Sequence, residues 1–375
     1  MDGPRPLGLY FHIPFCRSKC VYCDFYSLPR AEGLMDAYCD VLCAQLRAAS
    51  ETLLPYEADT IYFGGGTPSL LGAARLCRLL DAARQSCAVS SNAEITFEAN
   101  PESARDLRAL RALRAAGFNR VSLGVQSLDD GMLRALGRVH TAAEAVQAVD
   151  ALRRSGFDNL SLDLMYGLPG QTIDHWTDTL RSAADLAPEH LSCYGLKVEP
   201  GTPLARRTGG PPLPGDDEQA DMYLAASDAL RTRGYEHYEI SNFARPGFAS
   251  RHNMKYWTLG EYLGFGPGAA SDFGGRRTAC ARDLTAFLRG DAPLAEDRPI
   301  SPRERLSERV MLSLRTSRGI AASDFPLPFD RAEAFLRRCE AEGLAALGDG
   351  HWHLTPRGYL VSNAVILGVQ EALGL

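Results

Sequence analysis

Three cysteines lie close together near the start of the chain, in the spacing Cys16-x3-Cys20-x2-Cys23. They follow an alternating apolar run over residues 9–13, which predicts a strand. Three thiolates on one short loop can converge on a single metal centre. Iron–sulfur cubes usually take four cysteines, so a loop with three would leave one iron open to a small molecule that chelates it and receives an electron. We therefore predict that these cysteines hold a [4Fe–4S] cluster.

Two other interpretations of the loop stay open. Zinc would need a fourth ligand, for which His12 is nearest, and structural zinc sites normally show paired C-x2-C spacing. The thiols could also be buried and free, whereas an odd number of cysteines disfavours a disulfide framework. The other seven cysteines are scattered, mostly at apolar-face positions, and we interpret them as packing residues: Cys39, Cys43, Cys77, Cys87, Cys193, Cys280 and Cys339.

A strand–helix alternation repeats from residue 7 to about residue 198. Strand patterns cover 7–13, 60–63, 94–99, 120–126, 159–166 and 190–199, and helical patterns cover 34–54, 70–86, 104–116, 142–155 and 172–184. Six such units predict an α/β fold with a parallel sheet and right-handed crossovers. Curled, this sheet would be an incomplete barrel, with its reactive residues at the carboxyl ends of the strands.

Several polar or glycine-rich motifs follow or end these strands. The run Gly64-Gly65-Gly66-Thr67-Pro68 allows close approach of the backbone to a ligand, and it is not a phosphate loop because no G-K-[ST] follows. A lone Asp in an apolar strand is costly to bury unless it is paired, so Asp163 calls for a partner, and Arg138 is the candidate. The remaining candidates at strand ends are Glu98 and Gln126.

Composition limits the function further. The chain has 375 residues, 45% of them hydrophobic and 23% charged, which is enough for two or more domains. A net charge of −6 and a pI near 5.8 argue against nucleic acid as a partner. No signal-peptide pattern or membrane-length apolar run is present, so we expect a cytoplasmic protein in a reducing compartment.

The second half of the sequence changes character. Residues 204–217 have the composition of a mobile loop, and 217–234 predict a helix. A strand is expected over 235–244, followed by the string His252-Asn253-Met254-Lys255-Tyr256-Trp257 on an accessible loop. Residues 301–375 predict helix, helix, hairpin and helix, an arrangement typical of a small winged-helix-like α+β domain. Because this segment has nine Arg, no Lys and nine acidic residues, we favour a lid or partner-docking module over a DNA reader.

The cysteine loop resembles that of the radical S-adenosylmethionine (SAM) superfamily, and the wider string H-I-P-F-C-R-S-K-C-V-Y-C-D-F resembles the HemW family of haem chaperones. The resemblance implies a partial (β/α)6 barrel core over 1–200, a loop and haem-site extension over 201–300, and a C-terminal domain over 301–375. It also implies that a [4Fe–4S] cluster, SAM and haem are the cofactors. The positions implied for one SAM are Tyr10, Gly65 and Glu98, and those for a second are Tyr22, Gly66, Thr67, Gln126, Arg138 and Asp163.

The same resemblance assigns haem to His252, because the family's haem string H-N-x-x-Y-W is matched in full. An imidazole is the usual protein ligand to haem iron, and Tyr256 and Trp257 offer flat faces to a macrocycle. It further implies client haem proteins, such as respiratory ones, an electron donor and a homodimer as partners. One departure is Ala270, which stands where the family has a histidine.

The competing function is oxygen-independent coproporphyrinogen oxidase. These related enzymes carry a further cysteine where this chain has Phe25, and a longer segment before the cluster loop. We therefore expect no coproporphyrinogen oxidase activity. Radical-SAM haem breakdown with methyl transfer would keep the cysteine loop, but it gives no reason for the H-N-M-K-Y-W string.

Overall fold

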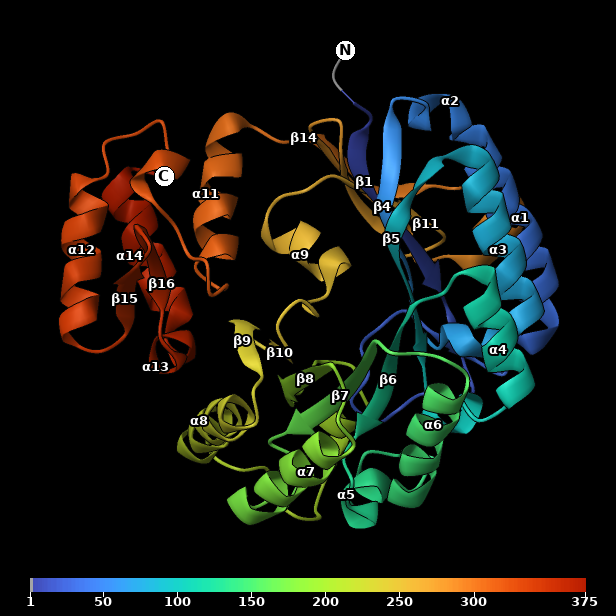
Figure 1. The fold of residues 1–375 in the computed structure, drawn as a ribbon, viewed down its shortest axis with the longest axis horizontal. Helices are drawn as coiled ribbons and strands as arrows, with labels where there is room; N and C mark the ends of the chain where they lie inside the picture. The colour runs from blue at the N-terminus through green and yellow to red at the C-terminus, as the bar shows by residue number, and fades with distance from the viewer. Residues whose placement is uncertain (1–2) are drawn as a thin grey trace.

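A computed structural model describes residues 3–375 and contains one large curved sheet. Its twelve strands run in the order β14-β13-β12-β11-β1-β4-β5-β6-β7-β8-β10-β9. The six central strands are mutually parallel and are those predicted from the sequence: β1 (Arg5–Ile13), β4 (Tyr56–Gly65), β5 (Ala88–Ala99), β6 (Arg120–Gln126), β7 (Leu160–Tyr166) and β8 (His190–Gly195). Figure 1 shows them curving into an open arc, so the predicted partial (β/α)6 barrel is confirmed.

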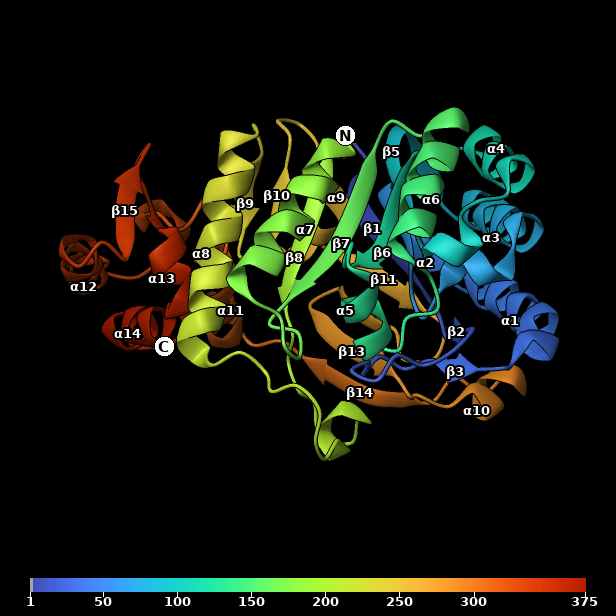
Figure 2. The ribbon, with the colours of Figure 1, turned by 90° about the horizontal axis from the view of Figure 1, so that it is seen from below.

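Helices cover the convex side of this arc, as Figures 1 and 2 show. They are α1 (Met35–Ala48), α2 (Ser50–Leu53), α3 (Ala73–Ser86), α4 (Leu107–Ala116), α6 (Ala142–Arg154), α7 (Ile173–Asp185) and α8 (Asp216–Thr232). The short helix α5 (Asp130–Ala135) instead follows the carboxyl end of β6, and its end contacts the cysteine loop. Thr141 and Thr172 cap α6 and α7 through their hydroxyls, and Gly117 ends α4 in the left-handed conformation. These local signals explain why the helix limits lie close to the predicted ones.

The two faces of the central strands differ sharply. Parallel strands covered on both faces usually read as continuous apolar runs. Here apolar residues alternate with polar ones. On β6, Val121, Leu123 and Val125 are fully buried in the core under the helices, whereas Arg120 and Ser122 line a cavity inside the arc. Tyr62, Glu98, Asp163 and Ser192 occupy corresponding positions on β4, β5, β7 and β8. The concave side of the sheet is therefore a polar interior.

Residues 235–299 extend the sheet at both edges. The single strand expected over 235–244 is wrong, because β9 (Glu236–Glu239) and β10 (Asn242–Ala244) form a hairpin that adds β10 beside β8. At the other edge β11 (Tyr262–Phe265) runs parallel to β1, and the antiparallel strands β12 (Ala270–Phe273), β13 (Arg276–Cys280) and β14 (Leu294–Pro299) follow. The short helix α10 (Leu284–Leu288) and the strand pair β2 (Phe15–Cys16) and β3 (Leu28–Pro29) complete the region.

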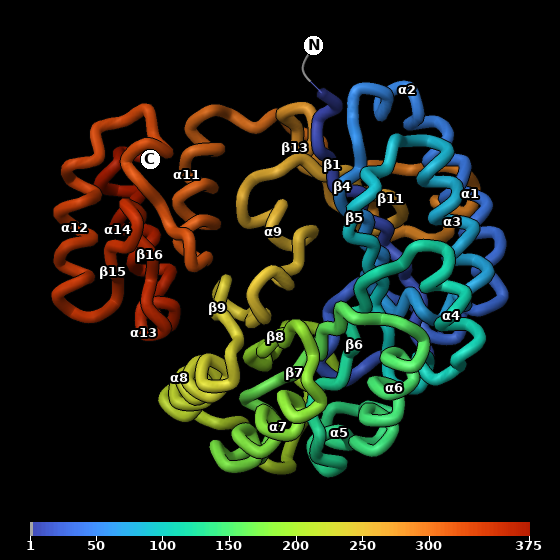
Figure 3. The backbone as a smooth tube through the Cα atoms, in the orientation of Figure 1, coloured from blue at the N-terminus to red at the C-terminus, as the bar shows by residue number. Residues whose placement is uncertain are grey.

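The helix α9 (Arg251–Trp257) lies inside the curve of the sheet, between its two ends (Figure 1). The accessible loop expected for this segment is wrong. Ser250 caps the helix by accepting from the N–H of Asn253, and the chain from β10 leads directly into it. The backbone tube in Figure 3 shows this inward excursion between β9 and the outer strands.

The C-terminal segment has its own apolar core, to which α8 also contributes Tyr223. It contains α11 (Pro302–Ser313), α12 (Asp330–Ala341), β15 (Ala345–Gly348), β16 (His351–Leu354), α13 (Pro356–Leu360) and α14 (Ser362–Leu373). The predicted hairpin turn is present, with Asp349 and Gly350 at positive φ, while the predicted last helix is divided near Val361. The domain limits stay a prediction. In the described residues, no helix is both long and apolar enough to cross a bilayer.

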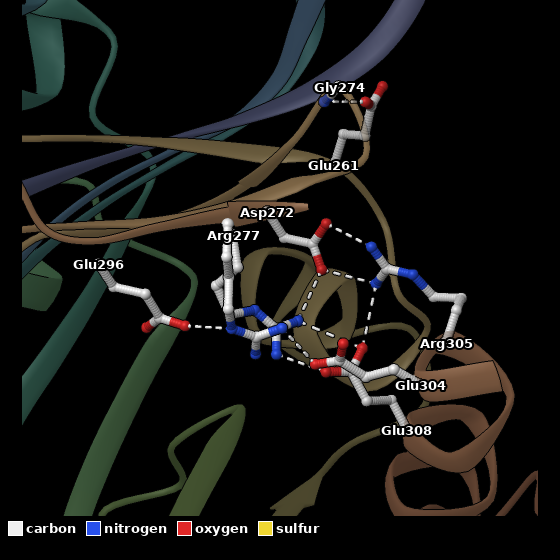
Figure 4. A network of polar contacts seen from close by, with 9 residues as sticks. Glu261, Asp272, Gly274, Arg277, Glu296, Glu304, Arg305 and Glu308 are labelled. Carbon is white, nitrogen blue, oxygen red and sulfur yellow. Dashed lines mark hydrogen bonds and ion pairs between the residues drawn. The ribbon is translucent and has the colours of Figure 1, made fainter. Parts of the chain in front are cut away.

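An ion-pair network joins this segment to the edge of the large sheet (Figure 4). Asp272 on β12 accepts two hydrogen bonds from Arg305 on α11, at 2.6 and 2.7 Å, and one from Arg277 on β13 at 2.9 Å. Arg277 in turn donates to Glu308 on α11. Two guanidiniums and two carboxylates that share partners in this way hold α11 against the sheet.

Removing Asp272 should loosen this junction. Asp272→Ala removes one of the two carboxylates that Arg277 and Arg305 share and leaves only Glu308. We therefore expect the free energy of unfolding to fall by about 2 kcal/mol, less than for a fully buried pair. Asp297→Ala, which breaks the exposed Arg276–Asp297 pair, is the matched control and should change it by less than about 0.5 kcal/mol. Equal effects in urea unfolding would contradict a structural role of the network.

Candidate functional site

A cavity of about 530 Å³ occupies the polar interior. Its lining brings together eleven of the thirteen candidate site residues: Cys16, Cys20, Tyr22, Cys23, Gly65, Gly66, Thr67, Glu98, Gln126, Arg138 and Asp163. These residues come from the cysteine loop, from β4 to β7 and from the segments that follow the strands. Its size is within the usual range for a small-molecule site. Tyr10 and His252 are not in the lining.

The cysteine loop lies at the end of the cavity that the carboxyl ends of the strands form. The Cys16 thiol is 3.5 Å from the hydroxyl of Thr67, and Arg138 Nη1 donates to Cys20 Sγ at 3.4 Å. Burial raises the pKa values of the Cys16 and Cys23 thiols. Across residues 3–375 no three His, Cys, Asp or Glu side chains are gathered into a ready metal site, so a cluster would have to draw the three thiols together.

His12 is poorly placed as a zinc ligand. Its Nε2 lies 2.9 Å from the carbonyl oxygen of Tyr26, and its Nδ1 lies 3.1 Å from the hydroxyl of Tyr10. Both ring nitrogens thus have partners within the protein, and burial lowers the pKa of the imidazole. The donor set that remains at the loop is three sulfurs beside an arginine, which suits a thiolate-bound cluster better than four-coordinate zinc.

Side chains at two positions of the glycine run, which lies at the end of β4, would clash with neighbouring atoms. Gly65 has φ +111°, and a Cβ there would lie within 3 Å of the His12 ring. A Cβ on Gly66 would lie 2.6 Å from the carbonyl oxygen of Phe15. The N–H groups of Gly66 and Thr67 donate to Ile13 and Phe15, so the run is tied to the cysteine loop. This contact places the glycine run and the thiols on one wall of the cavity.

Glu98 is held from two sides. Tyr62 donates its hydroxyl to Oε1 at 2.8 Å, and the Gly65 N–H donates to Oε2 at 3.0 Å. Burial raises the pKa of this carboxyl to about 7. The charge of Asp163 adds to the rise, while the two hydrogen bonds and the charge of Arg120 oppose it. Near neutral pH, Glu98 is therefore a mixture of the protonated and ionised forms. A bound cation would favour the ionised form.

The predicted pair of Arg138 with Asp163 is wrong. Arg138 Nη2 donates to Asn100 Oδ1 and to the Gly124 carbonyl oxygen, both at 2.7 Å. Asp163 instead accepts from three serine hydroxyls, those of Ser122, Ser161 and Ser192, at 2.7 to 3.4 Å. The buried aspartate is satisfied by neutral donors, a solution that the strand pattern could not distinguish from an ion pair.

Gln126 ends β6 with a strained backbone. Its φ is +65°, a left-handed value that non-glycine residues rarely adopt, and the pairing with β7 shifts register just before it. Such strain of about 1–3 kcal/mol is concentrated at ligand sites. The bend directs the end of β6 toward the cavity, which Gln126 lines.

Sequence reasoning missed Arg120, Asn100, Tyr62 and the serines that line the cavity. The signal was in the strands themselves, because alternate positions in parallel strands are polar where an apolar run is expected. Asn100 also follows β5 directly, in the run N-P-E, and its amide donates to Thr67.

The two candidates outside the lining form a buried stack with Tyr62. The Tyr62 ring lies 5.2 Å from that of His252 and 6.2 Å from that of Tyr10, each roughly parallel to it. His252 is 1% exposed, and its ring nitrogens lie 2.8 Å from the Thr60 hydroxyl and 2.9 Å from the Tyr256 hydroxyl. Neither nitrogen is open to a ligand in this arrangement. Its neighbour Asn253 does line the cavity.

Comparison with known proteins agrees with this geometry. The family model of the radical SAM superfamily matches residues 10–183, and that of the HemN C-terminal domain matches residues 300–361. The heme chaperone HemW of Escherichia coli (strain K12) is 36% identical, over 96% of this chain and 97% of its own. That of Bacillus subtilis (strain 168) is 35% identical, over 95% of this chain and 97% of its own. The chain belongs to the HemW family.

The HemW-family chain also has the fold of a solved radical SAM enzyme. The coproporphyrinogen III oxidase HemN of Escherichia coli superposes with a TM-score of 0.84 at 26% sequence identity, covering 99% of this chain and 90% of that one. The match includes the C-terminal segment as well as the partial barrel. Family membership and fold therefore agree on a radical SAM core.

The cysteine loop can be tested by iron content. After anaerobic reconstitution with iron and sulfide, we expect about four irons per chain and a brown protein. The triple variant Cys16→Ala, Cys20→Ala, Cys23→Ala should bind none. The double variant Cys39→Ala, Cys43→Ala removes buried thiols away from the cavity and should keep the iron. Tightly bound zinc without iron would contradict the cluster.

Glu98 predicts a pH dependence of SAM binding. Because its pKa lies near 7, the free protein loses the Glu98 charge below that pH, and a ligand that needs the charge must displace the proton. We expect SAM affinity to fall about tenfold from pH 8 to pH 6. Glu98→Gln should bind more weakly at pH 8 and show little change with pH. Calorimetry that finds the same slope in both proteins would exclude Glu98 as the titrating contact.

Proposed function

We propose that this protein is a haem chaperone that carries a [4Fe–4S] cluster with SAM, binds haem and delivers it to client haem proteins. The observation that carries the proposal is its similarity, over nearly the whole chain, to proteins named as heme chaperones. The complete H-N-M-K-Y-W string supports it. Its clients would include respiratory haem proteins, and an electron donor and a second copy of the chain would be further partners, in the cytoplasm.

The cofactor residues are assigned by their place in the cavity. Cys16, Cys20 and Cys23 would hold the cluster, which supplies an open iron and an electron to SAM. Gly65 and Glu98, with Tyr10 behind them, would hold one SAM. The second set, which is proposed only if two SAM molecules bind, is Tyr22, Gly66, Thr67, Gln126, Arg138 and Asp163.

Haem binding at His252 requires α9 to move. The Glu94 carboxylate accepts from the backbone N–H groups of Arg251 and His252, at 3.1 and 3.0 Å, and Lys255 pairs with Asp59 at 2.7 Å. These contacts hold the first turns of α9 inside the arc. Burial lowers the pKa of His252 to about 3, so its imidazole is neutral and able to ligate iron once it is released.

The competing proposal is coproporphyrinogen III oxidase, because a protein of that name shares the fold. At the position of the further oxidase cysteine this chain has Phe25, whose side chain is 68% exposed at the edge of the cavity. Ala270, which replaces the family's histidine, is exposed on β12. We favour the chaperone, because the haem string is complete and the fourth cysteine is absent.

Replacing His252 tests the haem site. His252→Gln keeps hydrogen-bonding capacity toward Thr60 and Tyr256 but supplies no imidazole, so we expect haemin affinity to fall at least about tenfold while the iron–sulfur absorbance stays. His175→Ala, on the exposed face of α7, is the control and should bind haemin as the unmodified protein does. Haemin binding by His252→Gln that matches the control would place the haem ligand elsewhere.

A further inference from the structure

Arg120 is a buried, charged side chain that is not among the residues proposed to hold the cofactors. It begins β6, six residues before Gln126, so the two lie about 20 Å apart along the strand. The residue is 1% exposed, yet it lines the cavity with Ser122 and Glu98. It therefore places a permanent positive charge deep inside the arc, far from the cysteine loop.

This guanidinium makes no hydrogen bond in the part of the chain that the structure describes. Its Nε is buried without a hydrogen bond, while its charge opposes the rise that burial causes in the pKa values of Glu98 and Asp163. The nearby carboxylates are already satisfied by other donors. Glu98 accepts from Tyr62 and Gly65, and Asp163 accepts from three serines.

Arg138 and Arg309 also have a buried Nε without a hydrogen bond, so Arg120 differs from Arg138 in its terminal nitrogens. Arg138, in the same cavity, makes three contacts through its terminal nitrogens, and Arg277 shares two carboxylates with its neighbours. Burying a charged donor that makes no hydrogen bond is costly even beside opposite charges. The N–H donors of Arg120 remain free for an acceptor, and its planar fork matches a carboxylate in a bidentate contact.

We propose that Arg120 binds a carboxylate group of the ligand that fills the deep part of the cavity. The proposal rests on the proposed function for its two candidate sources, which are a propionate of haem and the amino-acid carboxylate of SAM. A phosphate suits the place less well, because Glu98 and Asp163 line the same cavity and would repel a dianion. A single carboxylate charge pairs with the guanidinium and is repelled less than a dianion.

The test uses cluster-reconstituted full-length protein and two pairs of ligands. The first pair is haemin and haemin dimethyl ester, which lacks free propionates. The second is SAM and decarboxylated SAM, which lacks the carboxylate. Dissociation constants are measured for the unmodified protein, Arg120→Gln and Arg120→Lys, with circular dichroism and the unfolding midpoint as checks of folding.

We expect the unmodified protein to prefer the free carboxylate in one pair by about tenfold or more. Arg120→Gln should abolish that preference, and the pair in which it is lost identifies the source. Arg120→Lys should keep part of the preference, since it retains the charge without the fork, and it decides the matter if Arg120→Gln does not fold.

Two results would overturn the proposal. One is the absence of a preference in both pairs for the unmodified protein, and the other is a preference that neither variant reduces. Failure of the unmodified protein to bind haemin at all would instead contradict the haem-chaperone function. In that case the SAM pair alone decides the role of Arg120.

Discussion

A polar interior that must satisfy its own hydrogen bonds is the constraint on which this structure depends. Burying a polar group without a partner is costly, so each group on the concave side of the sheet needs a neighbour or a ligand. Most have neighbours: serines surround Asp163, and a tyrosine and a backbone N–H hold Glu98. Some atoms keep no partner, among them Nε of Arg120 and of Arg138, and we expect ligands at Arg120 and at the cysteine loop.

The same constraint explains the position of α9. The Glu94 carboxylate takes two N–H groups at the start of this helix, and His252 completes a stack with Tyr62 and Tyr10. Tyr62 also holds Glu98, so the haem string and the proposed SAM site share one tyrosine. Release of α9 for haem binding would therefore disturb Tyr62 and its hydrogen bond to Glu98. That hydrogen bond links the proposed haem site to the proposed SAM site.

The sequence predicted the parts of the fold that depend on local periodicity and on turn chemistry. The six strands, their helices and the hairpin at Asp349-Gly350 lie where these patterns placed them. Long-range partners could not be predicted. Arg138 and Asp163 are 25 residues apart in sequence and have opposite charges. In the structure Arg138 donates to the Asn100 side chain and Asp163 accepts from the Ser192 hydroxyl, both neutral groups. The inward position of the helix at His252 was missed because Glu94, which accepts the N–H of His252, lies 158 residues earlier in the chain.

The central claim is that the protein carries haem rather than makes porphyrin. The most direct measurement is mass spectrometry of an anaerobic reaction that contains reconstituted protein, SAM, a reductant and coproporphyrinogen III, on a sample whose haemin binding has been titrated. If the protein carries haem, haemin binds near one per chain and coproporphyrinogen is recovered unchanged. Formation of protoporphyrinogen would contradict this claim and would place the protein with the oxidases.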